Sequence, residues 1–594
     1  MRGDKLSKEE KPMIIGVIPQ FPPHSKQNIY GKVRMPPLGI ISVLTQIRHD
    51  LGVSAYAIDE NNYAGPVDSK ELPDHFALQK THPVKLAMFY GGMSNSIPRM
   101  YFTARQYQAL GTPTIAGGSH VDALPREALE SGIDVVVHGE GEETAKELVH
   151  TIIKDGQVVK DYKKRLEQIV GISFLDEQNK YVFTGRREPI ADLDALEDPD
   201  LGIIRFIKKD FSSIPISRGR GCNYRCEFCV VNTQYGPFKA SSAKKAFGQI
   251  KHYVDKGYKK FFVVDDNFAQ NIPETIELCK LLGDYKKKSK KKFGIMAQVR
   301  TEVAESNELI EAMRYGGVSS LAIGYESPIN EELRSMRKGV TVEKMVQRSR
   351  KLSQFFHLHG MFIFGYPSFK DSEFKSTLNL QQKAKAYAKF FKEARIDTIQ
   401  VFNAGPLPGS SLRRKLELED RIPPLSVVGW DKYDGLFLCY KPEPGVDAYE
   451  LHKLPRALMK NRYLGNFLKR NLNYANWMNW AYDLSIGFPI NFSVFYAKRF
   501  FHNLSQKEKE QWQKIVKAKK RLLPQRNVFH ESLLNAWHDT KKRIKNLAIK
   551  TYGADIARKW LKLYKDSDYS GVLKKLSSKK TRLKGTSRKS DDGA

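Results

Sequence analysis

The chain has 594 residues, of which 41% are hydrophobic, and a formal net charge of +32 at pH 7. That length predicts three or four domains, and the hydrophobic content is ordinary for a soluble protein. Five cysteines are too few for a disulfide framework. The positive charge favours an anionic partner without deciding between nucleic acid, a membrane surface and a phosphorylated substrate.

The first eleven residues are charged and contain no apolar core, so no signal peptide is visible. We therefore expect the protein in the reducing cytoplasm, and peripheral contact with the inner membrane surface is left open. Much of the positive charge lies in 286–292 and after Lys498, where a solvated face or tail accounts for most of it.

Residues 13–150 alternate between apolar runs and segments with helical spacing. The expected strands are 13–19, 53–58, 85–90, 114–116 and 133–137, and the expected helices are 36–51, 97–110 and 125–131. This alternation predicts a doubly wound, Rossmann-like α/β domain whose ligand crevice lies beyond the carboxyl ends of the strands.

Glycines follow three of these strands, at the edge where the crevice is expected. The candidate ligand-contacting glycines are Gly91, Gly117, Gly118, Gly139 and Gly141. A glycine lets the backbone approach a bulky ligand closely, although each pair taken alone also fits an ordinary turn.

Residues 151–205 are predicted to be a connector. They contain two short strand-like pieces, 169–174 and 181–184, followed by an acidic segment that places the domain boundary near Pro199.

Residues 206–412 show a regular strand-helix alternation. The expected strands are 214–217, 260–264, 294–298, 321–323, 361–364 and 398–402, and the expected helices are 243–256, 273–285, 307–314 and 342–354. Six strands followed by six loops predict a partial (β/α)6 barrel, in which functional groups lie at the carboxyl ends of the strands.

Three of the five cysteines lie in one loop after the first barrel strand: Cys222, Cys226 and Cys229. A structural zinc normally takes four nitrogen or sulfur ligands. This loop offers three, and His252 is too far along the chain to complete a compact site. Iron–sulfur clusters are held by thiolates, and a four-iron cluster with three cysteines keeps one iron open for another ligand. An iron–sulfur site is therefore favoured over a zinc or free-thiol loop.

The Cys-x3-Cys-x2-Cys spacing, with Phe228 just before the last cysteine, resembles the signature of radical S-adenosylmethionine (SAM) enzymes. The resemblance extends over residues 214–412. It implies a 4Fe-4S cluster on the three cysteines, whose open iron binds SAM and whose electron cleaves SAM to a 5′-deoxyadenosyl radical. Phe228 would pack near adenine or shield the cluster from water.

The same resemblance implies cofactor-binding roles for polar residues at the barrel strand ends. Asp265 and Asp266 would lie near the methionyl amino group of SAM, or would instead cap the next helix. Gln298 follows the third barrel strand. Arg300 would bind the SAM carboxylate and Glu326 the ribose or the amino group, with an Arg300–Glu326 salt bridge as the alternative. No catalytic residue is assigned.

Residues 13–150 resemble the cobalamin-binding domain that precedes many radical SAM domains. The resemblance rests on the order of the glycine pairs, on PPLG near the first helix and on GEGEET after the fifth strand. The DxHxxG motif that supplies a lower axial histidine in methionine-synthase-type domains is absent. His120 and His138 are therefore interpreted as loop histidines, and a vestigial domain that no longer binds the corrin remains an alternative.

The two resemblances together imply cobalamin-dependent methyl transfer to an unactivated carbon. One alternative is a cobalamin-associated radical rearrangement or cyclisation without methyl transfer. Another is a radical SAM methylthiotransferase acting on transfer RNA, but that family carries three further cysteines in its first domain, and no cysteine precedes Cys222 here.

Residues 413–570 are predicted to be mainly helical, with one strand at 436–440, and to line the substrate cavity. The aromatic-rich stretch 477–501 is too interrupted for a transmembrane span, and 571–594 are predicted to be a disordered basic tail. The expected partners are a small-molecule or lipid substrate and an external electron donor such as flavodoxin or ferredoxin. The basic carboxyl-terminal region also offers contact with an anionic surface, and no strong nucleic-acid motif is present.

Overall fold

The structure is a computed structural model that describes residues 13–22 and 34–472. The predictions for 477–501 and for the tail 571–594 lie outside the described residues. Within the described part of the chain, no helix is both long and apolar enough to cross a membrane.

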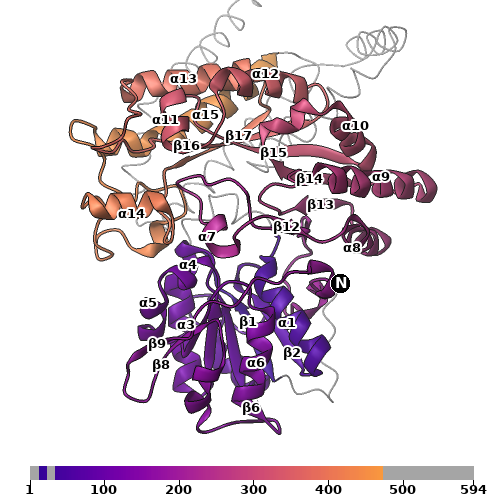
Figure 1. The fold of residues 1–594 in the computed structure, drawn as a ribbon, viewed down its shortest axis with the longest axis vertical. Coiled ribbons are helices and arrows are strands. Elements are labelled where there is room, and N and C mark those ends of the chain that lie inside the picture. Colours follow the sequence, from indigo (N-terminus) through magenta and orange to yellow (C-terminus); the bar gives the residue numbers. More distant parts are fainter. Residues whose placement is uncertain (1–12, 23–33, 473–594) are drawn as a thin grey trace, which may run out of the picture. The chain divides into compact units, whose positions relative to one another are not determined.

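The first domain is built on a seven-stranded sheet in the order β2-β1-β3-β4-β5-β8-β9 (Figure 1). Its parallel part consists of β1 (Ile14–Ile18), β2 (Ala55–Asp59), β3 (Leu86–Tyr90), β4 (Thr114–Gly117) and β5 (Val135–Val137). The order reverses between β1 and β3, which is the switch point at which such sheets bind ligands. The predicted doubly wound α/β fold is confirmed.

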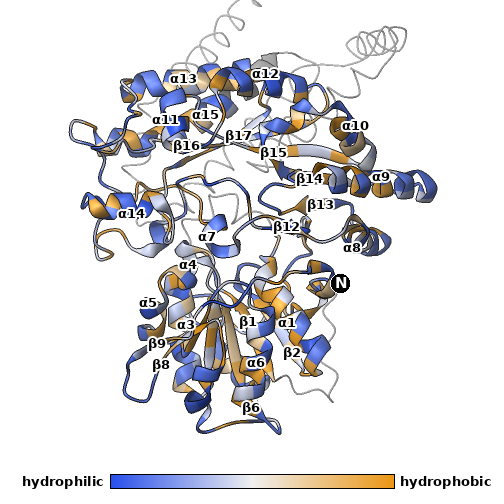
Figure 2. Ribbon diagram, in the orientation of Figure 1, coloured by the Kyte–Doolittle hydropathy of each residue, from blue (hydrophilic) through white to orange (hydrophobic). Residues whose placement is uncertain are grey.

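Helices cover both faces of this sheet. They are α1 (Leu38–Leu51), α2 (His75–Thr81), α3 (Ile97–Ala109), α4 (Ser119–Ala123), α5 (Pro125–Glu130) and α6 (Glu142–Ile152). Alternate residues of β1 enter two separate cores, because successive strand side chains point to opposite faces: Ile14 belongs to one and Ile15 to the other. Figure 2 shows the apolar residues concentrated along the strands, between the helices.

The contact between α1 and β1 depends on a small residue in the strand. A Cβ atom at Gly16 would lie 2.4 Å from the Leu44 Cδ1 atom of α1. The helix ends at Gly52, whose φ of 62° is the left-handed conformation that glycine adopts without strain. This close packing fixes the amino end of α1 near the carboxyl ends of the strands.

The first sheet continues beyond residue 150, where the sequence places the end of the domain. β8 (Ile172–Leu175) pairs antiparallel with β5, and β9 (Tyr181–Phe183) pairs antiparallel with β8. Part of the predicted connector therefore belongs to the first sheet. The remainder, up to residue 205, contains the short turns η6 (Leu193–Ala195) and η7 (Leu201–Ile203).

The second sheet has six parallel strands in chain order, as a partial barrel requires. They are β10 (Ile214–Ile216), β13 (Lys260–Val263), β14 (Gly294–Val299), β15 (Val318–Glu326), β16 (His357–Phe364) and β17 (Thr398–Asn403). The connecting helices are α8 (Ala243–Asp255), α9 (Ile272–Ser289), α10 (Asn307–Gly316), α11 (Asn330–Ser335), α12 (Val342–Leu352) and α13 (Leu380–Glu393). All six predicted strands are present.

The predicted strand at 436–440 does not form. Leu436, Cys439 and Tyr440 are buried, but the backbone of this segment joins no strand ladder. The Leu436 carbonyl accepts from the Asn403 side chain, and the Leu436 amide donates to Asp434. The apolar run that predicted a strand here therefore reflects burial of a segment held by side-chain hydrogen bonds.

The chain after the barrel packs against both domains. It contains α14 (Ser411–Leu418), η9 (Trp430–Lys432) and α15 (Ala448–Leu472). Trp430 joins a core cluster of the first domain, and its indole nitrogen donates to Glu127 at 2.9 Å. On α15, Tyr463 both donates to the Ile399 carbonyl and accepts from the Ile399 amide, so this helix covers the open edge of β17.

Candidate functional site

The cysteine loop is closed at its base by backbone contacts. β11 (Gly219–Arg220) pairs antiparallel with β12 (Lys239–Ala240). Gly221 has a φ of +79°, and a Cβ there would lie 2.4 Å from the Pro237 carbonyl oxygen. Only glycine fits where the two ends of the loop pass each other. The Cys222 amide then donates to the Gly236 carbonyl at 3.2 Å.

A buried glutamate anchors the middle of the loop to the barrel. Glu227 is 3% exposed and forms ion pairs with Arg337 and with Lys415 of α14, each at 2.9 Å. Its backbone amide donates to the Met336 carbonyl, and its carbonyl accepts from the Leu412 amide. The loop is thereby fixed to the segment after α11 and to α14.

The three thiols lie close enough to influence one another electrostatically. Burial raises the pKa of Cys226 and raises the pKa of Cys229 to about 12. Among the described residues, no three His, Cys, Asp or Glu side chains converge on a point where a single metal ion would bind. A cluster distributes its thiolate ligands over several iron atoms, so it does not require the convergence of a mononuclear site. Three thiols on one anchored loop fit that donor set.

The paired aspartates after β13 point in different directions. Asp265 is 1% exposed, and its Oδ1 accepts from the Arg218 amide at 2.8 Å, so it holds the start of the cysteine loop. Asp266 lines the cavity described below, and burial raises its pKa to about 6. Neither caps the following helix, because the Asn271 side chain caps α9. The capping alternative is wrong for both.

A group of charged residues lies beside Cys226 on the barrel side. The Arg300 guanidinium lies 3.7 Å from the ring centroid of Tyr224 and donates to the Lys338 carbonyl at 2.7 Å. Lys338 in turn pairs with Glu326 at 2.9 Å. The Arg300–Glu326 salt bridge considered from the sequence does not form, because Arg300 pairs with Glu302 at 3.2 Å instead.

Glu326 adopts a strained backbone at the end of β15. Its φ is +62°, and the β15–β16 register shifts between Gly324 and Glu326. A Cβ at Gly324 would lie 2.4 Å from the Glu326 Oε1 atom, so the carboxylate folds back over Gly324. Such non-glycine outliers persist where the surroundings hold them, and they concentrate at functional sites.

The glycines after β3 and β4 pack directly against each other. Gly118 has a φ of +126°, and a Cβ there would lie 2.6 Å from the Gly92 nitrogen and 2.8 Å from the Gly91 carbonyl carbon. Gly139, with a φ of +69°, has open space around it. A side chain is therefore excluded at Gly118, and backbone forms this part of the strand-end mouth.

One cavity of about 620 Å³ is lined both by this mouth and by the barrel entrance. Its size lies within the range of about 300–1,000 Å³ typical of ligand pockets. The predicted residues that line it are Gly117, Gly118, Gly139, Gly141 and Asp266. Barrel-side lining comes from Ser217 to Arg220, from Val230 and Val231 directly after Cys229, and from Tyr235.

An ion-paired group that the sequence did not reveal lies at the same cavity, which three of its members, Glu140, Glu142 and Arg220, line. Arg220 binds Glu140 at 2.7 Å and Glu142 at 2.6 Å, and Lys239 binds the second oxygen of Glu140 at 2.5 Å. The two glutamates lie in the GEGEET segment and the cations in the cysteine loop. Their pairing was not visible in the sequence, because 78 or more residues separate the partners.

Both candidate histidines are tied to the first domain. His138 bonds Asp122 at 2.6 Å through Nδ1 and Ser173 at 2.7 Å through Nε2, so both ring nitrogens are engaged. His120 is 1% exposed, bonds Ser94 through Nδ1, and lies against the Trp430 ring. Neither lies among the residues lining the cavity. His138 thus lies in the loop after β5, as interpreted from the sequence, whereas His120 lies within α4.

Phe228 and Gln298 lie on the barrel side. Phe228 is partly buried against the barrel core, which suits shielding of the loop. The Gln298 carbonyl accepts from the Phe268 amide, and its side chain donates to the Asp266 carbonyl at 3.5 Å.

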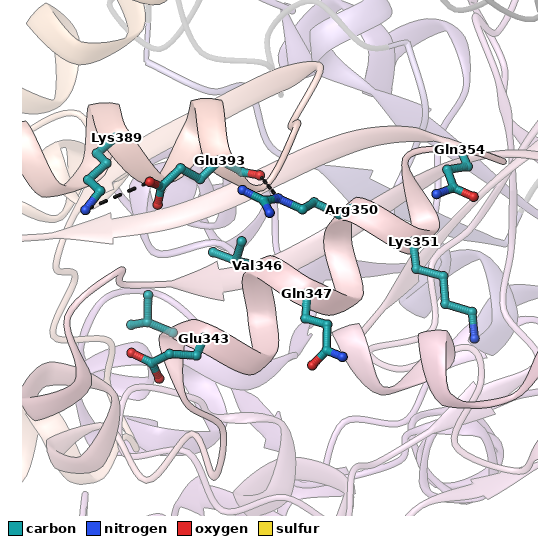
Figure 3. Close-up of a pocket in the computed structure, with 9 residues that line it drawn as sticks. Glu343, Val346, Gln347, Arg350, Lys351, Gln354, Lys389 and Glu393 are labelled. Carbon is teal, nitrogen blue, oxygen red and sulfur yellow. Dashed lines mark hydrogen bonds and ion pairs between the residues drawn. The ribbon is translucent and has the colours of Figure 1, made fainter.

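A second hollow, of about 650 Å³, lies between α12 and α13 on the outside of the barrel (Figure 3). Arg350 donates to the Glu393 carbonyl there, and Lys389 lies 3.9 Å from the Glu393 carboxylate. None of the predicted site residues lines this hollow. It is a groove between exposed helices, and the strand-end cavity is the better candidate site.

Two family profiles match the chain. The Radical SAM superfamily covers residues 216–380, and the B12 binding domain covers residues 31–149. The chain therefore contains both a Radical SAM domain and a B12-binding domain. The family resemblance inferred from the cysteine and glycine motifs is confirmed.

Curated relatives match parts of the chain. An uncharacterized methyltransferase of Pyrococcus horikoshii is 27% identical over 308 residues, which is 50% of this chain and 61% of the relative. An anaerobic magnesium-protoporphyrin IX monomethyl ester cyclase of Cereibacter sphaeroides is 29% identical over 273 residues, which is 44% of this chain and 43% of the relative. The chain thus spans about half the length of these relatives.

Two solved structures share the fold. The cobalamin-dependent SAM radical enzyme OxsB, with aqua-cobalamin and SAM bound, has a TM-score of 0.57 at 14% identity over 94% of this chain and 75% of its own. The radical SAM methyltransferase TsrM from Kitasatospora setae, with cobalamin and a [4Fe-4S] cluster bound, has a TM-score of 0.54 at 14% identity over 69% of this chain and 78% of its own.

Proposed function

We propose that the protein is a cobalamin-dependent radical SAM methyltransferase that methylates an unactivated carbon. The observation that carries this proposal is the single cavity lined by the glycine mouth of the first domain and by the barrel entrance next to Cys229. Relatives described as methyltransferases support it, among them the hopanoid C-2 methylase of Rhodopseudomonas palustris, 22% identical over 306 residues.

In this proposal Cys222, Cys226 and Cys229 hold the 4Fe-4S cluster, and Gly91, Gly117, Gly118, Gly139 and Gly141 form the corrin-binding mouth. When bound, the cluster supplies the electron that cleaves SAM, and the corrin supplies the transferable methyl group. The chain's own groups bind and orient. Arg300 and Lys338 place positive charge beside Cys226 for a carboxylate, and Asp266 presents a carboxyl group to the cavity. Val230 and Val231 line it with apolar side chains.

Radical cyclisation or rearrangement without methyl transfer is the second candidate. The cyclase of Cereibacter sphaeroides and the 4′-phospho-dehydrooxetanocin synthase of Priestia megaterium, 25% identical over 235 residues, favour it. Methylthiotransferases such as RimO of Pasteurella multocida are also similar, at 23% identity over 336 residues. The lack of any cysteine before Cys222 speaks against that chemistry.

The experiment starts from full-length protein, reconstituted anaerobically with iron and sulfide and then with hydroxocobalamin. We expect broad iron–sulfur absorption, retention of the corrin through gel filtration, and 5′-deoxyadenosine formed from SAM under a flavodoxin or ferredoxin reducing system. With a candidate small-molecule or lipid substrate, deuterium transfer into 5′-deoxyadenosine and a methylated product support methyl transfer. Deuterium transfer without methylation favours the second candidate, and absence of iron–sulfur absorption excludes both.

A further inference from the structure

The two strands at the base of the cysteine loop carry like charges at directly opposite positions. In the β11–β12 pair, Arg220 lies opposite Lys239. Like charges at opposed positions of an antiparallel pair destabilise it. Since Gly221 alone separates Arg220 from Cys222, the stability of this pair affects where the first cysteine lies.

The counter-charges come from the first domain. Glu140 places one carboxylate oxygen on Arg220 and the other on Lys239, so it bridges the two opposed cations. Glu142 forms an ion pair with the second guanidinium nitrogen of Arg220 and also accepts a hydrogen bond from the Ser42 hydroxyl at 2.7 Å. The carboxylates are 5% and 4% exposed and the cations 18% and 19%, so water screens these pairs weakly.

The same glutamates alternate with the glycines of the cavity rim. Gly139, Glu140, Gly141 and Glu142 all line the cavity, as does Arg220. A ligand that fixes this rim also fixes the carboxylates that neutralise the base of the cysteine loop. By linkage, ordering of the cysteine loop favours the rim conformation that holds the ligand.

We propose that Arg220 and Lys239, bound by Glu140 and Glu142, are positioning residues that couple occupation of the glycine-lined mouth to order in the cysteine loop. The identity of the ligand as a corrin rests on the proposed function. The coupling itself rests on the four-residue ion group and on the opposed cations in the β11–β12 pair.

Amide hydrogen exchange of the full-length protein, with and without hydroxocobalamin, tests the coupling. In the wild type we expect hydroxocobalamin to slow exchange in 138–143 and also in 218–223 and 236–241. In Arg220→Gln we expect slowing in 138–143 only, with exchange in the loop segments about tenfold faster than in the wild type with ligand. Arg220→Lys keeps the positive charge but lacks the planar guanidinium that binds both glutamates. It should restore part of the ligand-dependent protection of the loop segments.

The matched control is Lys251→Gln, which removes an exposed ion pair with Asp255 on α8. It should leave the ligand-dependent protection of both regions unchanged. A purely structural role for Arg220 would speed exchange equally with and without hydroxocobalamin, and this result would overturn the proposal. So would full protection of the loop segments in Arg220→Gln.

A double-mutant cycle in the ligand-free protein separates failure of this inference from failure of the proposed function. Arg220→Gln, Glu142→Gln and the double variant are compared by exchange in 138–143 and 218–223. Coupling predicts that each single substitution speeds exchange in both segments. It also predicts that the increase in the double variant is smaller than the sum of the increases in the two single variants. If the wild type binds no corrin but the cycle shows coupling, only the corrin assignment fails. Additive effects confined to the mutated segment contradict the coupling whether or not corrin binds.

Discussion

Both parallel sheets end in loops that line a ligand-sized cavity, but the two edges are built differently. The first sheet presents glycine backbone, and the carboxylates between these glycines, Glu140 and Glu142, are already paired with Arg220. Its nearby histidines already bond Asp122, Ser173 and Ser94. The barrel holds buried charge that does not line this cavity, with Arg300 and Lys338 beside Cys226. A backbone rim suits close approach of a large flat ligand, whereas buried charges suit a small charged one. Apart from the coupling proposed through Arg220 and Lys239, we therefore expect substitutions at each edge to affect mainly the cofactor at that edge.

The largest effect is expected at the cysteine loop. Cys226→Ala should abolish iron–sulfur absorption and 5′-deoxyadenosine formation, because a cluster on this loop would lose one of three thiolates. Cys279→Ala is the matched control, since Cys279 is buried in α9 and lies outside the loop. Hydroxocobalamin retention should survive in both variants. Retention of the absorption by Cys226→Ala would contradict the cluster assignment.

The next largest effect is expected at the glycine edge. Gly118→Ala forces a side chain into a φ of +126° and against the backbone of Gly91 and Gly92. Strain of this kind costs about 1–3 kcal/mol, so hydroxocobalamin affinity should fall by up to about a hundredfold, measured by equilibrium dialysis. Gly156→Ala, at a φ of +72° with open space, is the control and should bind normally. Equal loss in both variants would show that the effect is general destabilisation.

A smaller effect is expected at the charged edge. Lys338→Gln leaves the Glu326 carboxylate without the ion pair observed at 2.9 Å. We expect the KM for SAM to rise about tenfold, as for loss of one charged contact of about 1.4 kcal/mol, with hydroxocobalamin affinity unchanged. Lys441→Gln removes an exposed pair with Asp420 and should change neither. A loss of corrin affinity in Lys338→Gln would erase the distinction between the two edges.

The smallest effect on cofactor binding is expected from the histidine. His138→Gln should leave the absorption spectrum of bound hydroxocobalamin unchanged, because both ring nitrogens already bond Asp122 and Ser173. The protein should lose about 1–3 kcal/mol of stability, as for a buried hydrogen-bonding group, measured by thermal unfolding. A shift in the corrin spectrum would instead identify His138 as a cobalt ligand.

Local pattern was sufficient to predict most of the fold. The strands predicted from the apolar runs of the first domain and from the six strand-helix repeats of the barrel form in the structure. They were predictable because hydrophobic periodicity depends on residues close together in the sequence. The pattern misled at 436–440, where isolated apolar side chains are buried without a ladder. It also ended the first domain too early, because antiparallel addition of β8 to β5 is a long-range event.

The candidate site was only partly predictable. Of the residues predicted from their strand-end positions, Asp266 and four glycines line the cavity, whereas Gly91 does not. The sequence did not show that Asp265, unlike Asp266, accepts a hydrogen bond from the Arg218 amide. It also did not show that Lys338 pairs with Glu326. Adjacent residues in a strand-end loop point in different directions, and only the packed neighbours decide which one faces the cavity.

The sequence by itself determined that three cysteines share one loop, that glycines follow the strands of the first domain, and that a barrel pattern surrounds the cysteines. These are local features, set by spacing and by the conformations each residue type can adopt. Only the tertiary structure decided that Glu140 bridges Arg220 and Lys239, and that both sheet edges line one cavity. Those contacts join residues from separate domains, and they exist only once both hydrophobic cores have placed the strand ends together.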